Sequence, residues 1–330
     1  MESLAVGVVG VGHLGSLHAK MFAQVPSAKF VGIFDIDQER ARAFSTGFKV
    51  KAFESLDELL KNVRAVSIAT PTSTHFAIAR TAAMAGVHTF IEKPITETPE
   101  EAQQLIDLAR ERNVKIQVGH IERFNPALLA LEKYNLHPMF VESHRLAQFN
   151  PRGTDVAVVL DLMIHDIDII VSLVKSPLEK VEANGVAVVS DSIDIANARI
   201  QFQNGCVANV TASRISQRKM RKMRLFQRDA YISIDFSDGV AEVFRLVADG
   251  NPTASNTMLL GKIDHGTRKL KIIYEQPEIK EINALQYELE TFLHSIESNT
   301  EPPVTAQDGK RALEVAHAIM EKIREQKLPA

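Results

Sequence analysis

A predicted helix over residues 155–174 is apolar on most faces, yet it carries ionisable side chains. Asp161, His165 and Asp168 stand at positions i, i+4 and i+7 and therefore share one face. Burying such groups costs free energy unless they are paired or used. Imidazole can take the proton of a secondary alcohol, and a carboxylate one turn away can orient its ring. The pattern therefore suits a base that takes the proton of an alcohol, but it does not favour this over a histidine and an aspartate paired in the core.

Two other interpretations of these side chains remain open. A histidine and an aspartate paired in the core would show the same spacing. A metal site is less favoured because no third ligand has suitable spacing, so we predict no metal. Asp166 lies off the shared face, and we expect it at the surface or in a cap.

Lys93 is a second candidate, in Glu92-Lys93-Pro94 after an apolar run that predicts a strand. Ligands of open α/β sheets bind beyond the carboxyl ends of strands. An ammonium group there could hold a sugar hydroxyl or stabilise a developing oxyanion. A solvated loop lysine is the alternative, and position alone slightly favours it.

A glycine-rich loop stands near the start of the chain. Gly10, Gly12 and Gly15 form G-x-G-x-x-G around His13 and Leu14, between a predicted strand and a predicted helix. In that context the first glycine permits a tight turn, the second admits a pyrophosphate and the third lets helix pack on strand. The helix N-terminus adds N–H donors for the anion. The loop predicts dinucleotide binding.

Asp35 stands twenty residues after Gly15, at the end of the second predicted strand. A carboxylate there accepts hydrogen bonds from the ribose hydroxyls and repels a 2′-phosphate. We therefore expect NAD, with NADP less favoured, although Arg40 is close enough in sequence to soften the preference.

Two groups of elements must position these residues. Residues 4–118 alternate strands and helices, which indicates a parallel, doubly wound Rossmann sheet and an α/β fold. After Gly119, successive strands predict an α+β domain with a large, mostly antiparallel sheet. Strands of the first group are expected at Leu4–Val9, Phe30–Phe34, Ala65–Ala69, Val87–Ile91 and Lys115–Val118, with helices near 13–24, 37–46, 55–61, 73–85 and 98–112. Strands of the second group are expected at 139–147, 179–190, 194–203, 206–214, 220–227, 229–235 and 239–248, with helices near 124–134, 155–174, 283–297 and 306–326.

The length of 330 residues suits two domains. We place an NAD-binding Rossmann domain at 1–120 and an α+β substrate and oligomerisation domain at 121–330. The terminal helix, 306–326, could pack back on the first domain. Residues 249–268 are predicted as an exposed loop.

Bulk properties exclude several classes of function. The net charge of −3 offers no global field for nucleic acid or an anionic membrane. The single cysteine, Cys206, excludes an intramolecular disulfide and suits a reducing cytoplasm. The sequence shows neither a signal peptide nor a membrane span. A basic stretch at 214–228 has little aromatic interleaving, so we interpret it as a charged edge or interface strand rather than a nucleic-acid site.

Taken together, these segments resemble the GFO/IDH/MocA family of oxidoreductases over essentially the whole chain. The resemblance rests on the glycine loop, on Thr70-Pro71-Thr72-Ser73-Thr74-His75, on Ala85-Gly86-Val87-His88-Thr89-Phe90-Ile91-Glu92-Lys93-Pro94, and on Asp161-Leu162-Met163-Ile164-His165-Asp166-Ile167-Asp168. Members are two-domain NAD(P)-dependent dehydrogenases acting mostly on sugars, cyclitols and nucleotide sugars. The resemblance implies that Lys93, Asp161 and His165 are the catalytic group. It also implies a cis Lys93–Pro94 bond, and a cofactor site lined by Thr70, Pro71, His75, Glu92, Lys93 and Pro94.

A finer resemblance, carried by Gly119-His120-Ile121-Glu122-Arg123-Phe124-Asn125-Pro126 and the Asp161–Asp168 segment, is to bacterial and archaeal nucleotide-sugar members. It implies that Arg123 and Asn125 face the substrate, and Arg152 could meet a diphosphate. Family members commonly associate through the second-domain sheet, which implies a homodimer or homotetramer. Oxidation of a free sugar or inositol, or an NAD-binding protein that senses or assembles without chemistry, are the alternatives.

Overall fold

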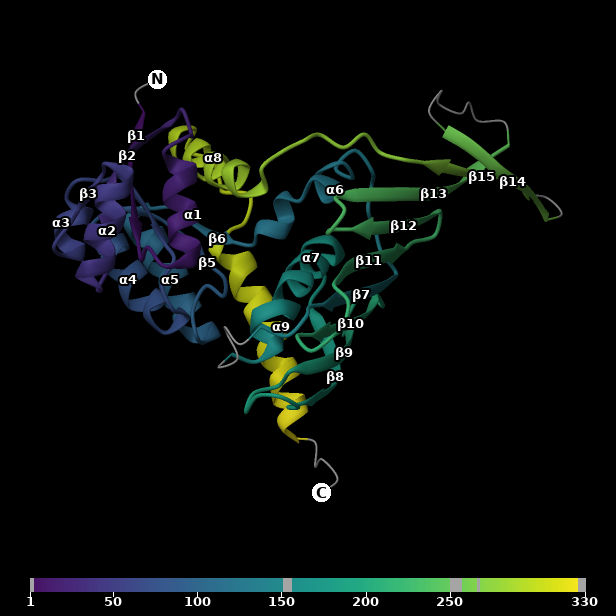
Figure 1. Cartoon of the computed structure of the whole chain (residues 1–330). Coiled ribbons are helices and arrows are strands. Elements are labelled where there is room, and N and C mark those ends of the chain that lie inside the picture. Colours follow the sequence, from purple (N-terminus) through teal and green to yellow (C-terminus); the bar gives the residue numbers. More distant parts are fainter. Residues whose placement is uncertain (1–2, 151–155, 250–256, 266–267, 326–330) are drawn as a thin grey trace. The chain divides into compact units, whose positions relative to one another are not determined.

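The structure, a computed structural model, describes residues 3–150, 156–249, 257–265 and 268–325, and it divides into two compact units (Figure 1). Unit 1 comprises Met1–Phe124 and Asn283–Glu314, and unit 2 comprises Asn125–Ile282 and Val315–Ala330. The segment 283–314, which the sequence boundary after residue 120 assigns to the second domain, therefore groups with the first unit by its contacts. In the described residues, no helix is long and apolar enough to cross a membrane.

Unit 1 contains a six-stranded sheet of order β3-β2-β1-β4-β5-β6 in which every pair is parallel. The predicted doubly wound sheet is thus confirmed, with one addition, the two-residue β3. Its strands are β1 (Leu4–Val9), β2 (Ala28–Phe34), β3 (Lys51–Ala52), β4 (Ala65–Ile68), β5 (His88–Glu92) and β6 (Ile116–Gly119). Its helices are α1 (His13–Phe22), α2 (Gln38–Phe48), α3 (Leu56–Leu60), α4 (Thr72–Met84), α5 (Pro99–Arg112), the 3₁₀ helix η1 (Ile121–Phe124), α8 (Ala284–Glu297) and the first half of α9 (Ala306–Glu325).

Local sequence explains where these helices begin and what they cover. The Ser55 side chain caps α3 by accepting the Glu58 N–H at 3.2 Å. Thr98 and Glu101 form a capping box at the start of α5. From the end of the chain, α8 buries Leu289 and Phe292 in the same core as residues of β1 and α1, which explains why segment 283–314 belongs to unit 1.

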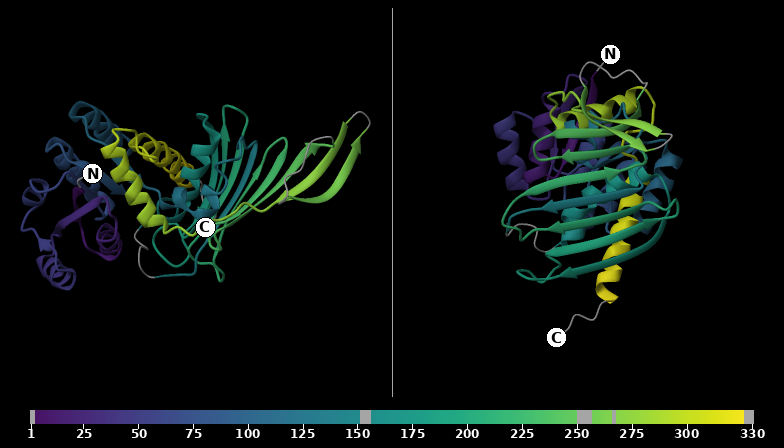
Figure 2. Two further views of the ribbon diagram at one scale, coloured as in Figure 1. Left: turned by 90° about the horizontal axis from the view of Figure 1, so that it is seen from above. Right: turned by 90° about the vertical axis from the view of Figure 1, so that its right-hand side faces the viewer.

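Unit 2 contains a nine-stranded sheet of order β14-β15-β13-β12-β11-β7-β10-β9-β8. Its strands are labelled in Figure 1, and Figure 2 shows the sheet from two further sides. Among the strand pairs that the described residues form in this sheet, only β7–β10 is parallel, so the predicted, mostly antiparallel sheet is confirmed. The strands are β7 (Phe140–Leu146), β8 (Leu178–Val186), β9 (Ile195–Phe202), β10 (Val207–Ser213), β11 (Met220–Phe226), β12 (Ala230–Asp235), β13 (Val240–Ala248), β14 (Thr257–His265) and β15 (Arg268–Glu275). The helices are α6 (Pro126–Leu129), the π-helix η2 (Val159–Met163), α7 (Ile164–Val174) and the second half of α9.

The two faces of this sheet differ because side chains alternate along each strand. On β7 and β11, Val141, Met223 and Leu225 are buried on the face that α7 and its neighbours cover. On the opposite face, five half-buried aromatic side chains form a row across five strands, with ring centroids 5.0 to 5.7 Å apart. Each member pairs directly with the next in the strand register. The row is Phe140, Phe226, Tyr231, Phe244 and Tyr274, and we call it the aromatic row.

Three sequence expectations for unit 2 are wrong. Residues 249–268 are not wholly loop, because β14 occupies Thr257–His265 and pairs with β15. The helix expected near 124–134 shortens to η1 and α6, since Asn125 and Pro126 start a new helix there. The basic stretch 214–228 contains β11, which lies between β12 and β7, so the edge-strand part of its interpretation is wrong and the interface part stays a prediction. Its Lys222 and Arg224 pair across strands with Asp235 and Glu142.

Candidate active site

The parallel sheet of unit 1 brings several predicted site residues to one edge. β1, β2, β4 and β5 run in the same direction, so the residues that follow them share the carboxyl edge of the sheet. These residues are Gly10, Asp35, Thr70 and Lys93. The strand order reverses between β1 and β4, the position at which open α/β sheets bind their ligands.

The glycine loop at this edge fits a dinucleotide. Gly10 has φ +84°, and a Cβ at Gly15 would lie 1.7 Å from the Gly10 carbonyl oxygen. Both positions therefore require glycine. A Cβ at Gly12 would meet nothing within 4 Å, so it would project into open space in front of the N-terminus of α1. That free space beside unused N–H groups is what a pyrophosphate needs. His13 and Leu14 are exposed in the first turn of the helix.

Asp35 is buried, and each of its carboxylate oxygens accepts a backbone N–H, one of them from the glycine loop. They accept the Val11 N–H at 2.8 Å and the Asp37 N–H at 2.9 Å, and Arg40 approaches to 3.4 Å. Sequence reasoning overlooked the next residue, Ile36, whose side chain is 91 % exposed. The available signal was a large apolar side chain directly after the acidic strand end, next to the carboxylate expected to bind the ribose.

Lys93 is half-buried, and the Lys93–Pro94 bond is cis, as the resemblance implies. The preceding side chain, Glu92, accepts a hydrogen bond from His18 Nε2 at 2.9 Å. Burial favours the neutral acid, but the hydrogen bond and charge of His18 and the charge of Lys93 outweigh it, so the pKa of Glu92 lies below its usual value. A carboxylate thus stands beside the candidate ammonium group.

His75 is buried, with Nδ1 2.9 Å from the carbonyl oxygen of Pro94 and Nε2 2.9 Å from that of Thr70. Burial lowers the pKa of His75, although both carbonyls favour the protonated ring. Its ring therefore holds backbone on both sides, while Thr70 is half-buried and Pro71 is exposed.

In unit 2, the three residues predicted to share a helix face differ in how deeply their side chains are buried. Asp161 lies in η2 and His165 in the first turn of α7, and both are half-buried. Asp168 is fully buried and belongs to the core. The sequence did not predict the π turn, a feature that occurs often at functional sites. The structure thus retains Asp161 and His165 as partly accessible groups.

The expectation for Asp166 is wrong. Its side chain is buried and forms an ion pair with Arg145 of β7, with contacts at 2.7 and 3.1 Å. The partner lies 21 residues away on another element, which sequence spacing could not reveal. This pair joins α7 to the sheet on the turn that carries His165.

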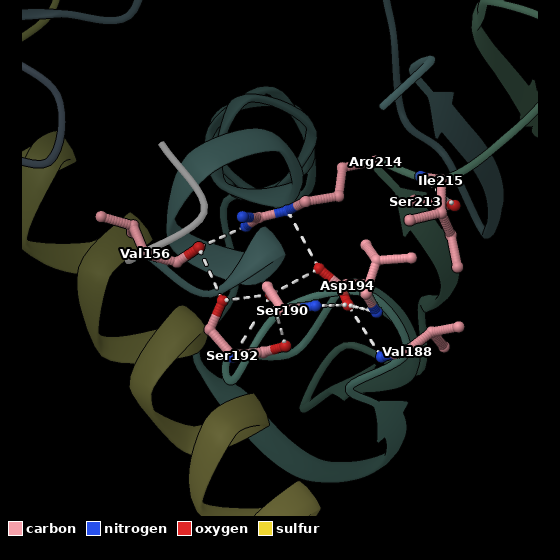
Figure 3. Close-up of polar contacts among 9 residues, drawn as sticks. Val156, Val188, Ser190, Ser192, Asp194, Ser213, Arg214 and Ile215 are labelled. Atoms are coloured by element: carbon pink, nitrogen blue, oxygen red, sulfur yellow. Dashed lines mark hydrogen bonds and ion pairs between the residues drawn. The ribbon is translucent and has the colours of Figure 1, made fainter. Parts of the chain in front are cut away.

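The segment leading into η2 is held by a buried cluster (Figure 3). The Arg214 guanidinium donates to the Val156 carbonyl oxygen, and the Val158 N–H donates to the Ile193 carbonyl at 2.9 Å. Arg214 lies 3.9 Å from the Asp194 carboxylate. Asp194 in turn accepts N–H bonds from Val188, Val189 and Ser190 at 2.7 to 3.0 Å and the Ser190 hydroxyl at 2.7 Å. We call Asp194, Arg214 and Ser190 the anchor cluster.

The predicted substrate residues have different surroundings. Arg123 is half-buried in η1. Asn125 caps α6 through Oδ1 and donates to the Phe236 carbonyl at 3.1 Å, so its amide already has structural partners. Arg152 lies outside the described residues. No group of three or more His, Cys, Asp or Glu side chains suited to a metal occurs among the residues that the structure describes.

Comparisons with known proteins assign the chain to a family. Residues 4–120 match the oxidoreductase family with an NAD-binding Rossmann fold, and residues 137–242 match the GFO/IDH/MocA C-terminal domain. A UDP-N-acetylglucosamine 3-dehydrogenase of Acidithiobacillus ferrooxidans is 39% identical over 96% of both chains. The chain belongs to the GFO/IDH/MocA family. As a member of this NAD-binding oxidoreductase family it is an enzyme with NAD as its cofactor.

A further relative and two solved structures extend the comparison. A myo-inositol 2-dehydrogenase of Thermotoga maritima is 25% identical over 98% of this chain and 97% of its own. Among solved structures, the A. ferrooxidans UDP-N-acetylglucosamine 3-dehydrogenase has a TM-score of 0.86, at 37% identity and 98% coverage of both chains. A levoglucosan dehydrogenase in complex with NADH and L-sorbose shares the fold, with a TM-score of 0.82 at 21% identity and 98% coverage of both chains.

Proposed function

We propose that this enzyme oxidises the C3 hydroxyl of UDP-N-acetylglucosamine. The observation that carries the proposal is the 39% identity, over nearly the whole length of both chains, to a UDP-N-acetylglucosamine 3-dehydrogenase. Lys93, Asp161 and His165 are all present and at least partly accessible.

In the proposed mechanism, three side chains act on the substrate hydroxyl: Lys93, Asp161 and His165. His165 removes the hydroxyl proton as the carbon–oxygen bond becomes a carbonyl, and Asp161 orients the imidazole. Lys93 holds the hydroxyl and stabilises the alkoxide as it forms. When bound, NAD supplies the acceptor for the hydride that leaves the carbon. Each positioned proton-transfer group contributes about 10² to 10⁴ in rate.

The preference for NAD follows from the end of β2. The buried carboxylate of Asp35 offers ribose hydroxyls an acceptor and repels a 2′-phosphate. The exposed Ile36 beside it gives such a phosphate no cation and gives the adenosine an apolar surface. Arg40 is already engaged by Asp35 and Asp37, which leaves it less available to a phosphate.

The nucleotide part of the substrate would require cations. Arg123, Asn125 and Arg152 are the residues we propose for the substrate, the two arginines being suited to the diphosphate because guanidinium matches phosphate geometry. A free cyclitol is the second candidate substrate, since myo-inositol 2-dehydrogenase is also a full-length relative.

We further infer a homo-oligomer, a dimer or a tetramer, formed through the open face of the nine-stranded sheet. The aromatic row places five half-buried rings side by side on that face. A contiguous apolar surface of this kind is typical of interfaces. The single, buried Cys206 is consistent with a cytoplasmic location.

Steady-state rates of NADH formation with UDP-N-acetylglucosamine, free N-acetylglucosamine and myo-inositol test the proposed reaction. We expect turnover only with the nucleotide sugar, and a loss of about 10²-fold or more in kcat for His165→Ala and for Lys93→Ala. Rates near wild type in either variant would remove that residue from the mechanism. Turnover of inositol alone would mean that a free cyclitol, and not the nucleotide sugar, is the substrate.

A further inference from the structure

Lys93 is flanked on both sides by residues that buried histidines hold. His18 of α1 binds the side chain of Glu92, and His75 of α4 binds the carbonyl of Pro94. We propose that His18 and His75 are positioning residues that together fix Lys93 relative to the two cofactor loops. This inference rests on the catalytic role proposed for Lys93.

The His18 side has defined donors and acceptors. A carboxylate only accepts, so Nε2 of His18 carries the proton that binds Glu92 Oε1 at 2.9 Å. Nδ1 lies 2.7 Å from the Ser67 hydroxyl of β4, which can either accept from this nitrogen or donate to it. His18 and Ser67 are almost completely buried, at 1 % and 0 % exposure. The contacts from Ser67 through His18 therefore orient the Glu92 carboxylate. Because Ser67 is buried, its hydroxyl cannot contact a substrate.

The Glu92 carboxylate packs closely against Gly119 of the neighbouring strand. A Cβ at Gly119 of the neighbouring β6 would lie 3.0 Å from Glu92 Oε1 and 3.1 Å from its Cδ. The Glu92 carboxylate thus fills the space that a larger residue at 119 would need. Its other oxygen accepts the Lys93 N–H at 3.3 Å, which transmits the orientation to the backbone of Lys93.

On the other side of Lys93, His75 contacts two carbonyl oxygens, those of Pro94 and Thr70, each at 2.9 Å. A neutral imidazole carries one N–H and donates to one of these carbonyls at a time. The ring is 1 % exposed, so its polar atoms serve the backbone and not a ligand. It joins the residue after Lys93 to the loop that follows β4.

Each histidine also belongs to an element that begins at the cofactor edge. α1 starts directly after Gly12, and α4 starts directly after Pro71. The Lys93 backbone is consequently tied to the glycine loop through His18 and to the Thr70-Pro71 loop through His75. A displacement of about 1 Å at a reacting group can cost 10²-fold in rate, so this support matters for kcat.

Paired amide substitutions test the proposal, because asparagine places its amide nitrogen near the Nδ1 position and glutamine near the Nε2 position. For His18, glutamine keeps the donor to Glu92 and asparagine loses it. For His75, asparagine keeps the donor to Pro94 and glutamine loses it. We expect His18→Gln and His75→Asn to retain most of kcat, and His18→Asn and His75→Gln to lower kcat about tenfold or more. KM for NAD should change much less than kcat.

At position 18 the glutamine variant should have the higher kcat, and at position 75 the asparagine variant should. A merely structural role would not give this opposite order at the two positions. His88→Asn is the matched control, since His88 stands at the amino end of the same strand, β5, and should leave kcat unchanged. In a Lys93→Ala background, the four substitutions should cause little further loss of the residual rate. The same rank order at both positions, or an undiminished loss in that background, would overturn the proposal.

Hydrogen exchange separates this inference from the proposed function. If wild-type protein oxidises none of the sugars, the proposed reaction fails, and exchange at the amides of residues 90–97 becomes the readout. His18→Asn and His75→Gln should then raise exchange there above the levels in His18→Gln and His75→Asn. Equal exchange in all four variants would overturn the positioning role.

Discussion

Glu92 and His88 stand at opposite ends of β5 and show how one strand sets two different charge states. At the carboxyl end, His18 and Lys93 favour the ionised form of Glu92 beside the candidate catalytic amine. At the amino end, burial and the charges of Arg64 and Lys115 lower the pKa of His88 to about 4. The neutral ring accepts the Lys115 N–H at 2.8 Å. The surroundings of β5 therefore favour a charged carboxylate at its carboxyl end and a neutral imidazole at its amino end.

The low pKa of His88 predicts a loss of stability in acid. Above pH 6.5 the ring is neutral in both folded and unfolded chains. Between pH 6.5 and 4 the unfolded chain gains a proton that the folded chain does not, so the free energy of unfolding falls, by about 2 kcal/mol at most at pH 5. Below pH 4 this loss is complete.

His88→Asn keeps an acceptor for the Lys115 N–H and cannot titrate in this range. Denaturant unfolding at pH 7 and pH 5 should therefore show a smaller loss for this variant than for wild type. His294→Asn, at an exposed position on α8, is the matched control and should lose as much as wild type. An equal loss in all three proteins would show that His88 does not control the acid response.

At the scale of elements, the sequence predicted what local pattern determines. The strands of the parallel sheet follow from apolar runs, and the helix starts at Ser55 and Thr98 follow from their caps. β14 was missed because the Gly- and Asn-rich residues around it obscured its Met258-Leu259-Leu260 run, and pairing with β15 decides the structure there. The π turn at Asp161 and the Arg145–Asp166 pair depend on contacts between distant segments. Candidate site residues could thus be proposed from the sequence, but the contacts that hold them in place could not.

The anchor cluster yields a prediction at this same scale. Burial opposes ionisation of Asp194, but the N–H bonds from Val188, Val189 and Ser190 and the Ser190 hydroxyl hold its pKa well below the usual range. Asp194→Asn replaces one acceptor oxygen by a donor and leaves Arg214 without its carboxylate. We expect a loss of about 2 to 4 kcal/mol in the stability of unit 2, measured by denaturant unfolding.

Because the cluster also holds Val156 and Ile193 next to η2, Asp194→Asn should lower kcat per folded molecule. Ser192→Ala, which removes the hydroxyl contacts to the Val156 carbonyl at 3.4 Å and to the Ser190 hydroxyl at 3.2 Å but keeps the Asp194 carboxylate, is the matched control. It should change stability by about 1 kcal/mol or less. Wild-type stability in Asp194→Asn would mean that the cluster does not hold this segment.

At the scale of the whole molecule, the open face of the nine-stranded sheet combines features that a lone subunit does not need. Its aromatic row crosses β7, β11, β12, β13 and β15, and β14 at the sheet edge exposes Met258, Leu259 and Leu260 by 51 to 60 %. Exposed apolar edge strands are aggregation hazards unless they are covered. Association of two such faces would bury the row and serve as the interface of a specific oligomer, provided that it buries at least about 1,000 Å² in total.

Phe226 is the residue at which this association is best tested, since its ring contacts both Phe140 and Tyr231 within the row. Phe226→Glu places a carboxylate among apolar rings, and we expect the dissociation constant of the oligomer to rise about thirtyfold or more. Analytical ultracentrifugation over a range of concentrations measures the shift toward monomer, and far-ultraviolet circular dichroism checks that the sheet persists. Met84→Glu, at an exposed position on α4 of unit 1, is the matched control and should leave the assembly unchanged. A wild-type monomer at all concentrations, or an unaltered assembly in Phe226→Glu, would show that this face does not join subunits.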